Sequence, residues 1–175
     1  MMSQVIAAAP TPARRGFRTG AKVLLVALAM LCSQAASADP AVAEQKLQLA
    51  KSDYQLFKLY YQYGKIYAQS GQVPSAQAYF QSAYVQSITL SMDLLSLGAE
   101  NRDTLQRGQC RDCNKQRQAI SYNDIAGMHV DIIKAYMPLL VQSPTSQPLM
   151  QQVDIKTIEL DMDMAQLEQA MHAAQ

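Results

Sequence analysis

Apolar residues recur along most of the chain with the spacing of α-helices. In four segments, at 40–70, 74–97, 115–142 and 148–173, apolar side chains return every three or four residues. No segment sustains the alternation of period two that is typical of a β-strand. The pattern therefore predicts one all-α domain over 39–175, built either as a four-helix bundle or as two packed helical hairpins.

Each predicted helix carries a stripe that we expect to face the core. In the second and fourth helices the stripes consist of Ala76, Phe80, Ala83, Ser87, Ser91 and Leu94, and of Val153, Leu160, Met164, Leu167 and Met171. In the first and third they consist of Leu49, Leu56, Tyr60, Tyr63 and Tyr67, and of Ile125, Met128, Ile132, Tyr136 and Leu139. Pro138 is expected to kink or end the third helix.

The connection between the second and third predicted helices is the longest in the domain. Gly98 is placed to follow the end of the second helix, and residues 98–114 are mostly polar. The third helix begins either near Asn114 or at a capping pair formed by Ser121 and Asp124. A connection of this length is typical of a functional or mobile segment.

Residues 60–83 resemble a tetratricopeptide repeat. The residues that carry this resemblance are, in order, Tyr60, Tyr63, Gly64, Tyr67, Gly71, Ala76, Phe80 and Ala83. Gly64 and Ala76 would let the two helix backbones approach each other, and the aromatic rings would fill the space around that contact. The alternative is a tight antiparallel hairpin within a bundle. Either interpretation gives a scaffold with a binding face.

Residues 1–38 have the order of a secretory signal peptide. Their charges are all positive and include Arg14 and Arg15, an apolar run follows, and a small-x-small site predicts cleavage between Ala38 and Asp39. The apolar run is shorter than the roughly 20 residues that a membrane-spanning helix needs. The arginine pair resembles a twin-arginine signal, and the general secretory route is the alternative. Both routes predict an exported protein, most simply in the periplasm of a Gram-negative bacterium.

Charge and composition exclude several classes of function. Without residues 1–38 the chain has 11 Lys and Arg against 14 Asp and Glu, so a surface for nucleic acid or anionic lipid is not expected. No Ser-His-Asp order, phosphate-binding glycine loop or pair of catalytic carboxylates can be assembled from the sequence. We therefore expect no catalytic residue, no cofactor and no metal ion, and a protein that is not an enzyme by itself.

Cys110 and Cys113 are the only cysteines after the signal peptide. In an oxidising compartment the simplest prediction is a disulfide that stiffens the 98–114 connection. Alternatives are a redox-active pair whose thiol pKa is lowered by the following helix, a metal site, or an interchain disulfide. Covalent haem attachment would need a histidine directly after the second cysteine, where the chain has Asn114.

Tyrosine is concentrated in the first predicted hairpin. Tyr54, Tyr61 and Tyr84 lie partly off the predicted stripes, so we expect some of their hydroxyl groups to reach the surface. Amphipathic rings of this kind are favoured at protein interfaces, which makes these three residues a candidate interface. The alternative is that they fill the core of a bundle that has no Trp.

In size, export signal and helical build, the chain after residue 38 resembles the small accessory subunits of periplasmic membrane-bound, quinone-reducing alcohol and sugar dehydrogenases. The resemblance implies a large subunit that holds the quinone or flavin cofactor, and a cytochrome subunit that accepts the electrons. This chain would assist their assembly or stability and reach the membrane only through them. The rival hypotheses are a small thiol-disulfide redox protein that uses Cys110 and Cys113, and a free-standing tetratricopeptide-like peptide binder.

Overall fold

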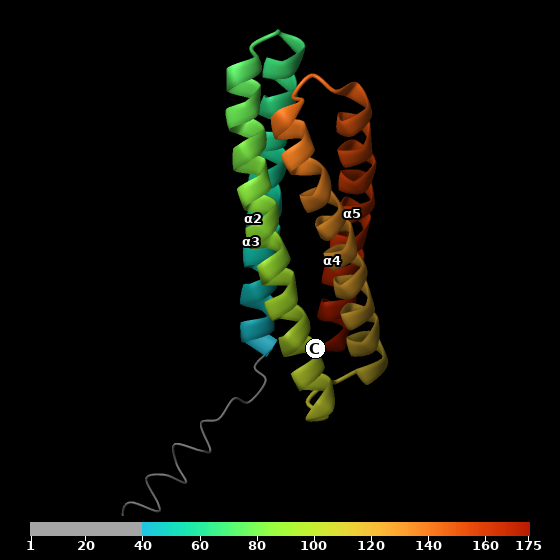
Figure 1. The fold of residues 1–175 in the computed structure, drawn as a ribbon. Coiled ribbons are helices and arrows are strands. Elements are labelled where there is room, and N and C mark those ends of the chain that lie inside the picture. Colours follow the sequence, from blue (N-terminus) through green and yellow to red (C-terminus); the bar gives the residue numbers. More distant parts are fainter. Residues whose placement is uncertain (1–39) are drawn as a thin grey trace, which may run out of the picture. The chain divides into compact units, whose positions relative to one another are not determined.

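The computed structural model describes residues 40–175, which form four antiparallel α-helices (Figure 1). These are α2 (Pro40–Gln69), α3 (Val73–Gln106), α4 (Cys113–Gln142) and α5 (Gln147–Ala174). Successive helices run in opposite directions, and no strand occurs among residues 40–175. The prediction of an all-α, four-helix domain is confirmed.

Two sequence predictions fall outside the described part of the chain. The proposed signal peptide at 1–38, with its cleavage site at Ala38 and Asp39 and its arginine pair at Arg14 and Arg15, precedes residue 40.

None of the helices that the structure describes has an apolar stretch long enough to cross a bilayer.

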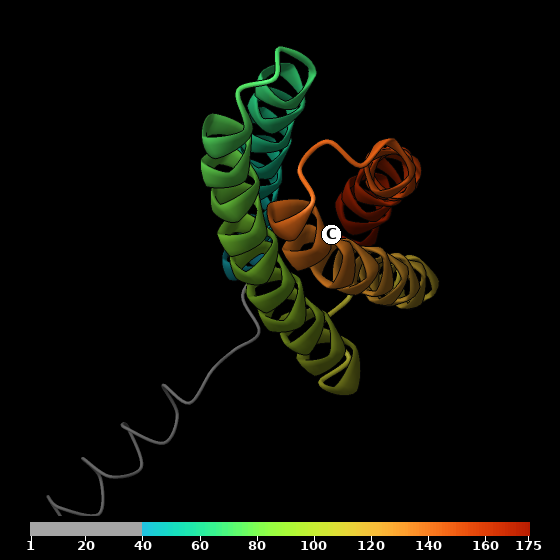
Figure 2. The same cartoon turned by 45° about the horizontal axis from the view of Figure 1, so that its top comes forward.

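Buried positions recur every three or four residues in α2, α3 and α4 and over most of α5, which is the repeat of antiparallel coiled-coil packing. α3 packs between α2 and α4, and α4 packs against α5, so each helix lies beside its neighbour in the chain (Figure 2). The α2 and α5 backbones approach each other at far fewer points than any of these neighbouring pairs. Long side chains therefore have to close this fourth seam of the bundle.

Tyrosines and lysines of α2 close the seam with α5. Side chains spaced seven residues apart on both helices form three ion pairs, Lys51–Glu168 at 2.6 Å, Lys58–Asp161 at 2.9 Å and Lys65–Asp154 at 2.7 Å. Two lysine ammonium groups also lie over tyrosine rings, 4.5 Å from the Tyr54 centroid and 5.4 Å from that of Tyr61. Part-exposed pairs of this kind contribute little to stability individually, but their spacing fixes the register of α2 against α5.

The predicted core stripes are confirmed in two helices and wrong in the other two. In α3 and α5 every residue of the predicted stripe is buried. In α2 the buried stripe instead contains Leu47, Phe57 and their neighbours, and Leu49 is 58% exposed. In α4 the buried stripe lies one residue further along than predicted, so Met128 is 59% exposed. One residue turns a helix face by about 100°, which is enough to move a side chain from core to solvent.

The predicted connection at 98–114 is also wrong, because α3 continues to Gln106. Its last turns carry polar residues that are buried against α4 rather than exposed: Gln116 Nε2 donates to Asn101 O at 3.1 Å and to Asn101 Oδ1 at 3.0 Å. Gly98 therefore lies inside the helix. A Cβ atom there would come 2.6 Å from Asn123 Nδ2, so glycine lets α4 approach closely.

α4 begins before the predicted capping pair and passes through its proline. Asp112 caps the helix by accepting hydrogen bonds from the backbone N–H of Asn114 at 2.9 Å and of Lys115 at 3.2 Å. Ser121 and Asp124 consequently lie within the helix. Pro138 does not end it, and α4 continues to Gln142.

A pair of aspartates faces across the α2–α3 contact and predicts a pH dependence. Burial, together with the hydrogen bond and the negative charge of Asp53, raises the pKa of Asp93 to about 6. An acid whose pKa is higher in the folded state stabilises that state when protonated, and this contribution is lost as the pH rises through about 6. Asp93→Asn should therefore raise the free energy of unfolding at pH 7 by about 1 kcal/mol, after allowance for solvent screening.

Urea unfolding of wild type and Asp93→Asn at pH 4.5 and pH 7 measures this effect. The stability difference between the two proteins should be larger at pH 7. Asp103→Asn is the matched control, since Asp103 on the same helix pairs with Arg107 at 2.9 Å and its removal should bring no gain at pH 7. A constant difference between wild type and Asp93→Asn at both pH values would contradict the prediction.

Candidate functional site

Tyr54 and Tyr61 do not form the exposed interface that the sequence predicted. They are only 3% and 1% exposed, and each hydroxyl donates to a backbone carbonyl of α5, on Thr157 and Met150, at 2.8 Å. Burial, and next the nearby carboxylates of α5, raise the pKa of both phenols well above its usual range. The prediction is wrong for these two residues because a buried Tyr is stable where its hydroxyl finds an acceptor. Tyr84 is half-buried and packs against the core.

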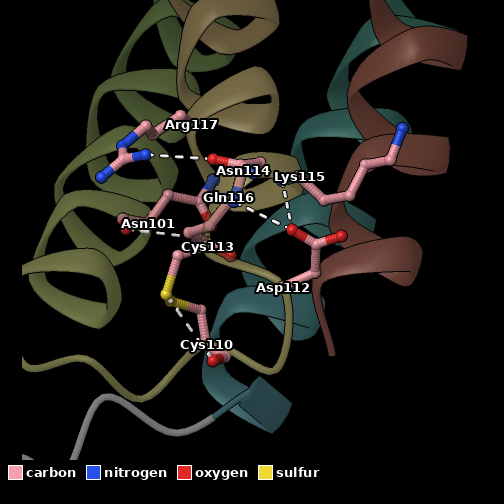
Figure 3. The surroundings of a disulfide bond; sticks show 8 residues. All are labelled: Asn101, Cys110, Asp112, Cys113, Asn114, Lys115, Gln116 and Arg117. Carbon is pink, nitrogen blue, oxygen red and sulfur yellow. Dashed lines mark hydrogen bonds between the residues drawn. A yellow bond between two sulfur atoms is a disulfide. The ribbon is translucent and has the colours of Figure 1, made fainter.

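A disulfide joins Cys110, in the short connection between α3 and α4, to Cys113, the first residue of α4 (Figure 3). Between them, the backbone N–H groups of Arg111 and Asp112 both donate to the carbonyl of Ala174, at 3.0 and 3.2 Å. The connection thus satisfies a carbonyl at the C-terminal end of α5, which has no partner within its own helix. This geometry favours a structural disulfide, since the bond bridges the residues on either side of the segment that binds the end of α5.

Removing the disulfide should lower the stability of the domain, and it should not change thiol-disulfide exchange activity. The chain-entropy relation for so short a loop gives about 2 kcal/mol for Cys110→Ser/Cys113→Ser. Thermal unfolding measures the loss, and reduction of the wild type should reproduce it. An insulin-reduction assay checks the redox alternative: thiol-disulfide exchange by the wild type that the double variant lacks would contradict a purely structural role.

His129 joins α4 to α5 through two carboxylates. Its Nδ1 lies 2.6 Å from Asp163 Oδ2, and its Nε2 lies 3.2 Å from Glu159 Oε2. A hydrogen bond from Lys156 to Glu159 lowers the pKa of that carboxyl. Because both ring nitrogens face carboxylates, the imidazole has no nitrogen left for a substrate or a metal ion. Residues 40–175 contain no group of three or more His, Cys, Asp and Glu placed to hold a metal ion.

The feature that stands out in the folded chain is a bundle end without ionisable acids or bases other than tyrosine. Residues 66–92 and 135–153 contain no Asp, Glu, Lys, Arg or His. The first segment includes the α2–α3 turn and the second includes the α4–α5 turn, and both turns lie at the same end of the bundle (Figure 1). We call these two segments together the uncharged end. The Lys65–Asp154 and Lys134–Asp131 ion pairs mark its boundary.

Exposed apolar residues and half-buried tyrosines lie on the uncharged end among Gln and Ser. Ile66 on α2 is 56% exposed and Val85 on α3 is 50% exposed. Tyr67 and Tyr79 stack with their ring centroids 5.2 Å apart, and the neighbouring Tyr63 ring lies 5.3 Å from that of Tyr79. Depletion of charge together with partly exposed aromatic rings is the composition typical of the centre of a protein–protein interface.

The uncharged end is not evident from the sequence because its two halves are far apart in the chain. Each charge-free segment can be read from the sequence, but one segment alone is compatible with a buried hairpin. Only the antiparallel topology shows that both segments meet at one end. Near this end Tyr63 is exposed, whereas Tyr54 and Tyr61 are buried.

The comparisons with known proteins give no relative: no protein-family model, curated protein or solved structure matches the chain.

Proposed function

We propose that the chain after its signal peptide is a non-catalytic, exported helical subunit that docks on a larger protein of the cell envelope. The observation that carries the proposal is the uncharged end, where Ile66 and Val85 are exposed, the Tyr67–Tyr79 stack is half-buried and neither segment contains a charged residue. Charged groups of a partner would lose their hydration on binding to this end, and neither segment would offer them an opposite charge. The proposed partner surface is therefore uncharged as well.

The reactive groups of the described residues support a structural subunit over an enzyme. The disulfide shapes the α3–α4 connection, His129 is held between two carboxylates, and the buried tyrosine hydroxyls bind carbonyls of α5. Each of these groups already has a partner within the bundle, which favours binding through the surface rather than chemistry at a reactive centre.

The partner that we propose follows from the resemblance in size, export and helical build. It is a periplasmic, quinone-reducing dehydrogenase whose large subunit holds the cofactor and whose cytochrome subunit accepts the electrons. The chain would assist assembly or stability of that complex and associate with the membrane only through it.

Introducing a charge on the uncharged end tests the proposal. Ile66→Lys and Val85→Lys should each weaken association with the partner at least about tenfold, since a buried, unpaired ammonium group costs more than 1.4 kcal/mol. Both side chains are half exposed in the free chain, so its stability should change by less than about 0.5 kcal/mol. Met162→Lys is the matched control, because Met162 on α5 is 59% exposed and lies outside both uncharged segments.

Purification of tagged chain from detergent-solubilised membranes of the producing organism provides the partner. A cofactor-bearing large subunit recovered at a fixed ratio with wild type and Met162→Lys, and lost with Ile66→Lys, is the expected result. Affinities of the purified components then give the fold-change. Recovery of the wild-type chain as a lone monomer would contradict docking, and equal weakening by Met162→Lys would contradict the assignment to the uncharged end.

A further inference from the structure

α2 carries a second stripe on the side that faces away from the bundle. Its eight exposed positions are spaced alternately three and four residues apart, which is the repeat of a helix that packs against another helix. They are Val42, Gln45, Leu49, Ser52, Leu56, Leu59, Tyr63 and Ile66, and we call them the outer stripe. Its six apolar and aromatic members are between 36% and 58% exposed, and no other helix that the structure describes exposes as many large hydrophobic residues. An exposed apolar strip of this length is typical of an interaction site.

No charge interrupts this side of α2. Every residue between 41 and 69 whose side chain is exposed is uncharged, and the six charged residues are half-buried at the edges that face α3 and α5. All four lysines form ion pairs with those two helices. Of the acids, Asp53 hydrogen-bonds to Asp93 of α3, and Glu44 lies 3.4 Å from His172 of α5. A neutral face does not repel a second copy of itself, and it offers no opposite charge to a charged partner.

The outer stripe is complementary to itself when two copies of α2 run antiparallel. We place the two-fold axis level with the midpoint between residues 57 and 58. Leu56 then meets Leu59 of the second copy at the centre, and Leu49 meets Ile66 of the second copy further out. The symmetry repeats each contact, so four of the six layers pair one apolar side chain with another.

The two remaining layers favour the antiparallel over the parallel orientation. Each pairs the small Ser52 with the large Tyr63 of the second copy. A parallel pair in register would instead place two Tyr63 rings in one layer and two Ser52 side chains in another, so one layer would be overfilled and the other underfilled. The exposed residues that flank the antiparallel contact on the α5 side are all glutamines, whose amides can hydrogen-bond to one another: Gln48, Gln55, Gln62 and Gln69.

Charge also selects this register. If the second copy moved by one heptad toward the start of α2, the two Asp53 carboxylates would face each other beside the axis, and like charges so placed oppose association. In the register described here Asp53 lies level with Tyr60 of the second copy, whose hydroxyl can donate to a carboxylate.

The area of the contact is sufficient for a weak, reversible dimer. About fourteen residues of each copy lie in it: six of the outer stripe, the four glutamines and four at the edge beside α3. A standard interface has about 20–30 residues a side and buries about 1,600 Å², so this contact would bury roughly 900 Å² in total. An area of this size is in the range of transient complexes, and we expect a dissociation constant of about 10–100 µM.

We propose that the outer stripe binds a second copy of this chain and forms an antiparallel, two-fold symmetric dimer through α2. The dimer is a property of the free chain and does not rest on docking at the uncharged end, with which the contact shares only residues 66–69. A partner docked on those residues would compete with the second copy.

Sedimentation equilibrium of the purified protein between about 1 µM and 1 mM tests the proposal, since this range brackets the expected dissociation constant. A monomer–dimer equilibrium is the expected result. Leu59→Lys should raise the dissociation constant at least about a hundredfold, because symmetry places two unpaired ammonium groups in the contact and each weakens it at least tenfold. Circular dichroism should show unchanged helix content, since Leu59 is 47% exposed in the free chain.

Two other lysine substitutions keep the two surfaces apart. Met162→Lys, at a 59% exposed position of α5, should dimerise like wild type. Val85→Lys, which should weaken docking at the uncharged end, should also leave the dimer intact because Val85 lies on α3 outside the outer stripe. Failure of one proposal is therefore measured independently of the other.

Disulfide cross-linking of a mixture of tagged Leu49→Cys and untagged Ile66→Cys tests the orientation. The antiparallel dimer brings these two positions within reach of a disulfide, so the mixed pair should form. Two Leu49→Cys copies should not cross-link, because seventeen residues of helix would separate their sulfur atoms by about 26 Å along the axis. A protein that stays monomeric at about 1 mM, a dimer that Leu59→Lys does not weaken, or a Leu49→Cys protein that cross-links to itself would overturn the proposal.

Discussion

Gly64→Val should lower the free energy of unfolding by about 3 kcal/mol, although valine is normally the better helix former. A Cβ atom at Gly64 would lie 2.5 Å from Cδ1 and Cε1 of Phe80, well inside the distance at which carbon atoms repel. Phe80 is fully buried and its ring lies 5.9 Å from the ring of Tyr61, so it has little room to move away. The substitution should therefore destabilise the packing of α2 against α3.

A matched glycine and a second substitution make this result specific. Gly127→Val in α4 should change stability by less than about 0.5 kcal/mol, because a Cβ atom there meets nothing within 4 Å. Phe80→Leu should relieve part of the clash, so the double variant should be more stable than the sum of the single losses predicts. Urea unfolding measures the wild type and the four variants. A Gly64→Val protein as stable as wild type would show that the two helices do not approach closely at Phe80.

The hairpin contact was predictable from the sequence because it depends on local spacing. Gly64 and Phe80 lie on consecutive helices joined by a tight turn, and Gly71 in that turn has a φ of 74°, a conformation that glycine adopts readily. A close contact between such helices needs a small residue on one side and a large one on the other. The tetratricopeptide-like pattern contains both, whichever larger architecture surrounds it.

The choice between two apolar stripes on α2 could not be made from the sequence. One stripe contains Leu49 and Leu56, and the other contains Leu47, Tyr54 and Tyr61. Hydrophobicity alone does not decide between them, because the first stripe also contains Tyr60, Tyr63 and Tyr67, and a tyrosine hydroxyl in either stripe is costly to bury without a partner. The partners are backbone carbonyls of α5, about ninety to a hundred residues away in the chain. Without the position of α5, the tyrosines were taken for surface residues.

The polar end of α3 was mispredicted for the same physical reason. Asn101 and Thr104 have the composition of a loop, but they are buried, since Gln116 Nε2 donates to both oxygens of Asn101 and the Thr104 hydroxyl donates to the carbonyl of Glu100. A residue type predicts exposure only when no partner is within reach, and partners across helices are not visible in local patterns. The uncharged end was missed in the same way, since its two halves meet only after the chain has folded.

Tyr61→Ala should open the contact between α2 and α5. We expect it to lower the free energy of unfolding by about 4 kcal/mol, the second large effect. Tyr61 is fully buried between these two widely spaced helices, and its ring also stacks on Phe57 at 5.9 Å. Its removal leaves a cavity and takes away the hydrogen bond to Met150 O. Because α5 is tied to α2 mainly through such long side chains, its amide protons should exchange with solvent before those of α2 and α3.

Two further substitutions separate the hydroxyl group from the ring. Tyr61→Phe keeps the ring and should cost only about 1 kcal/mol, the net worth of one hydrogen bond. Tyr63→Phe removes a hydroxyl from the same helix at a 42% exposed position, and it should change stability by less than about 0.5 kcal/mol. Hydrogen exchange of the Tyr61→Ala protein decides where the bundle opens. Uniform loss of protection in all four helices would contradict a weak α2–α5 seam, because it would mean that this contact unfolds only together with the α2–α3 and α3–α4 contacts.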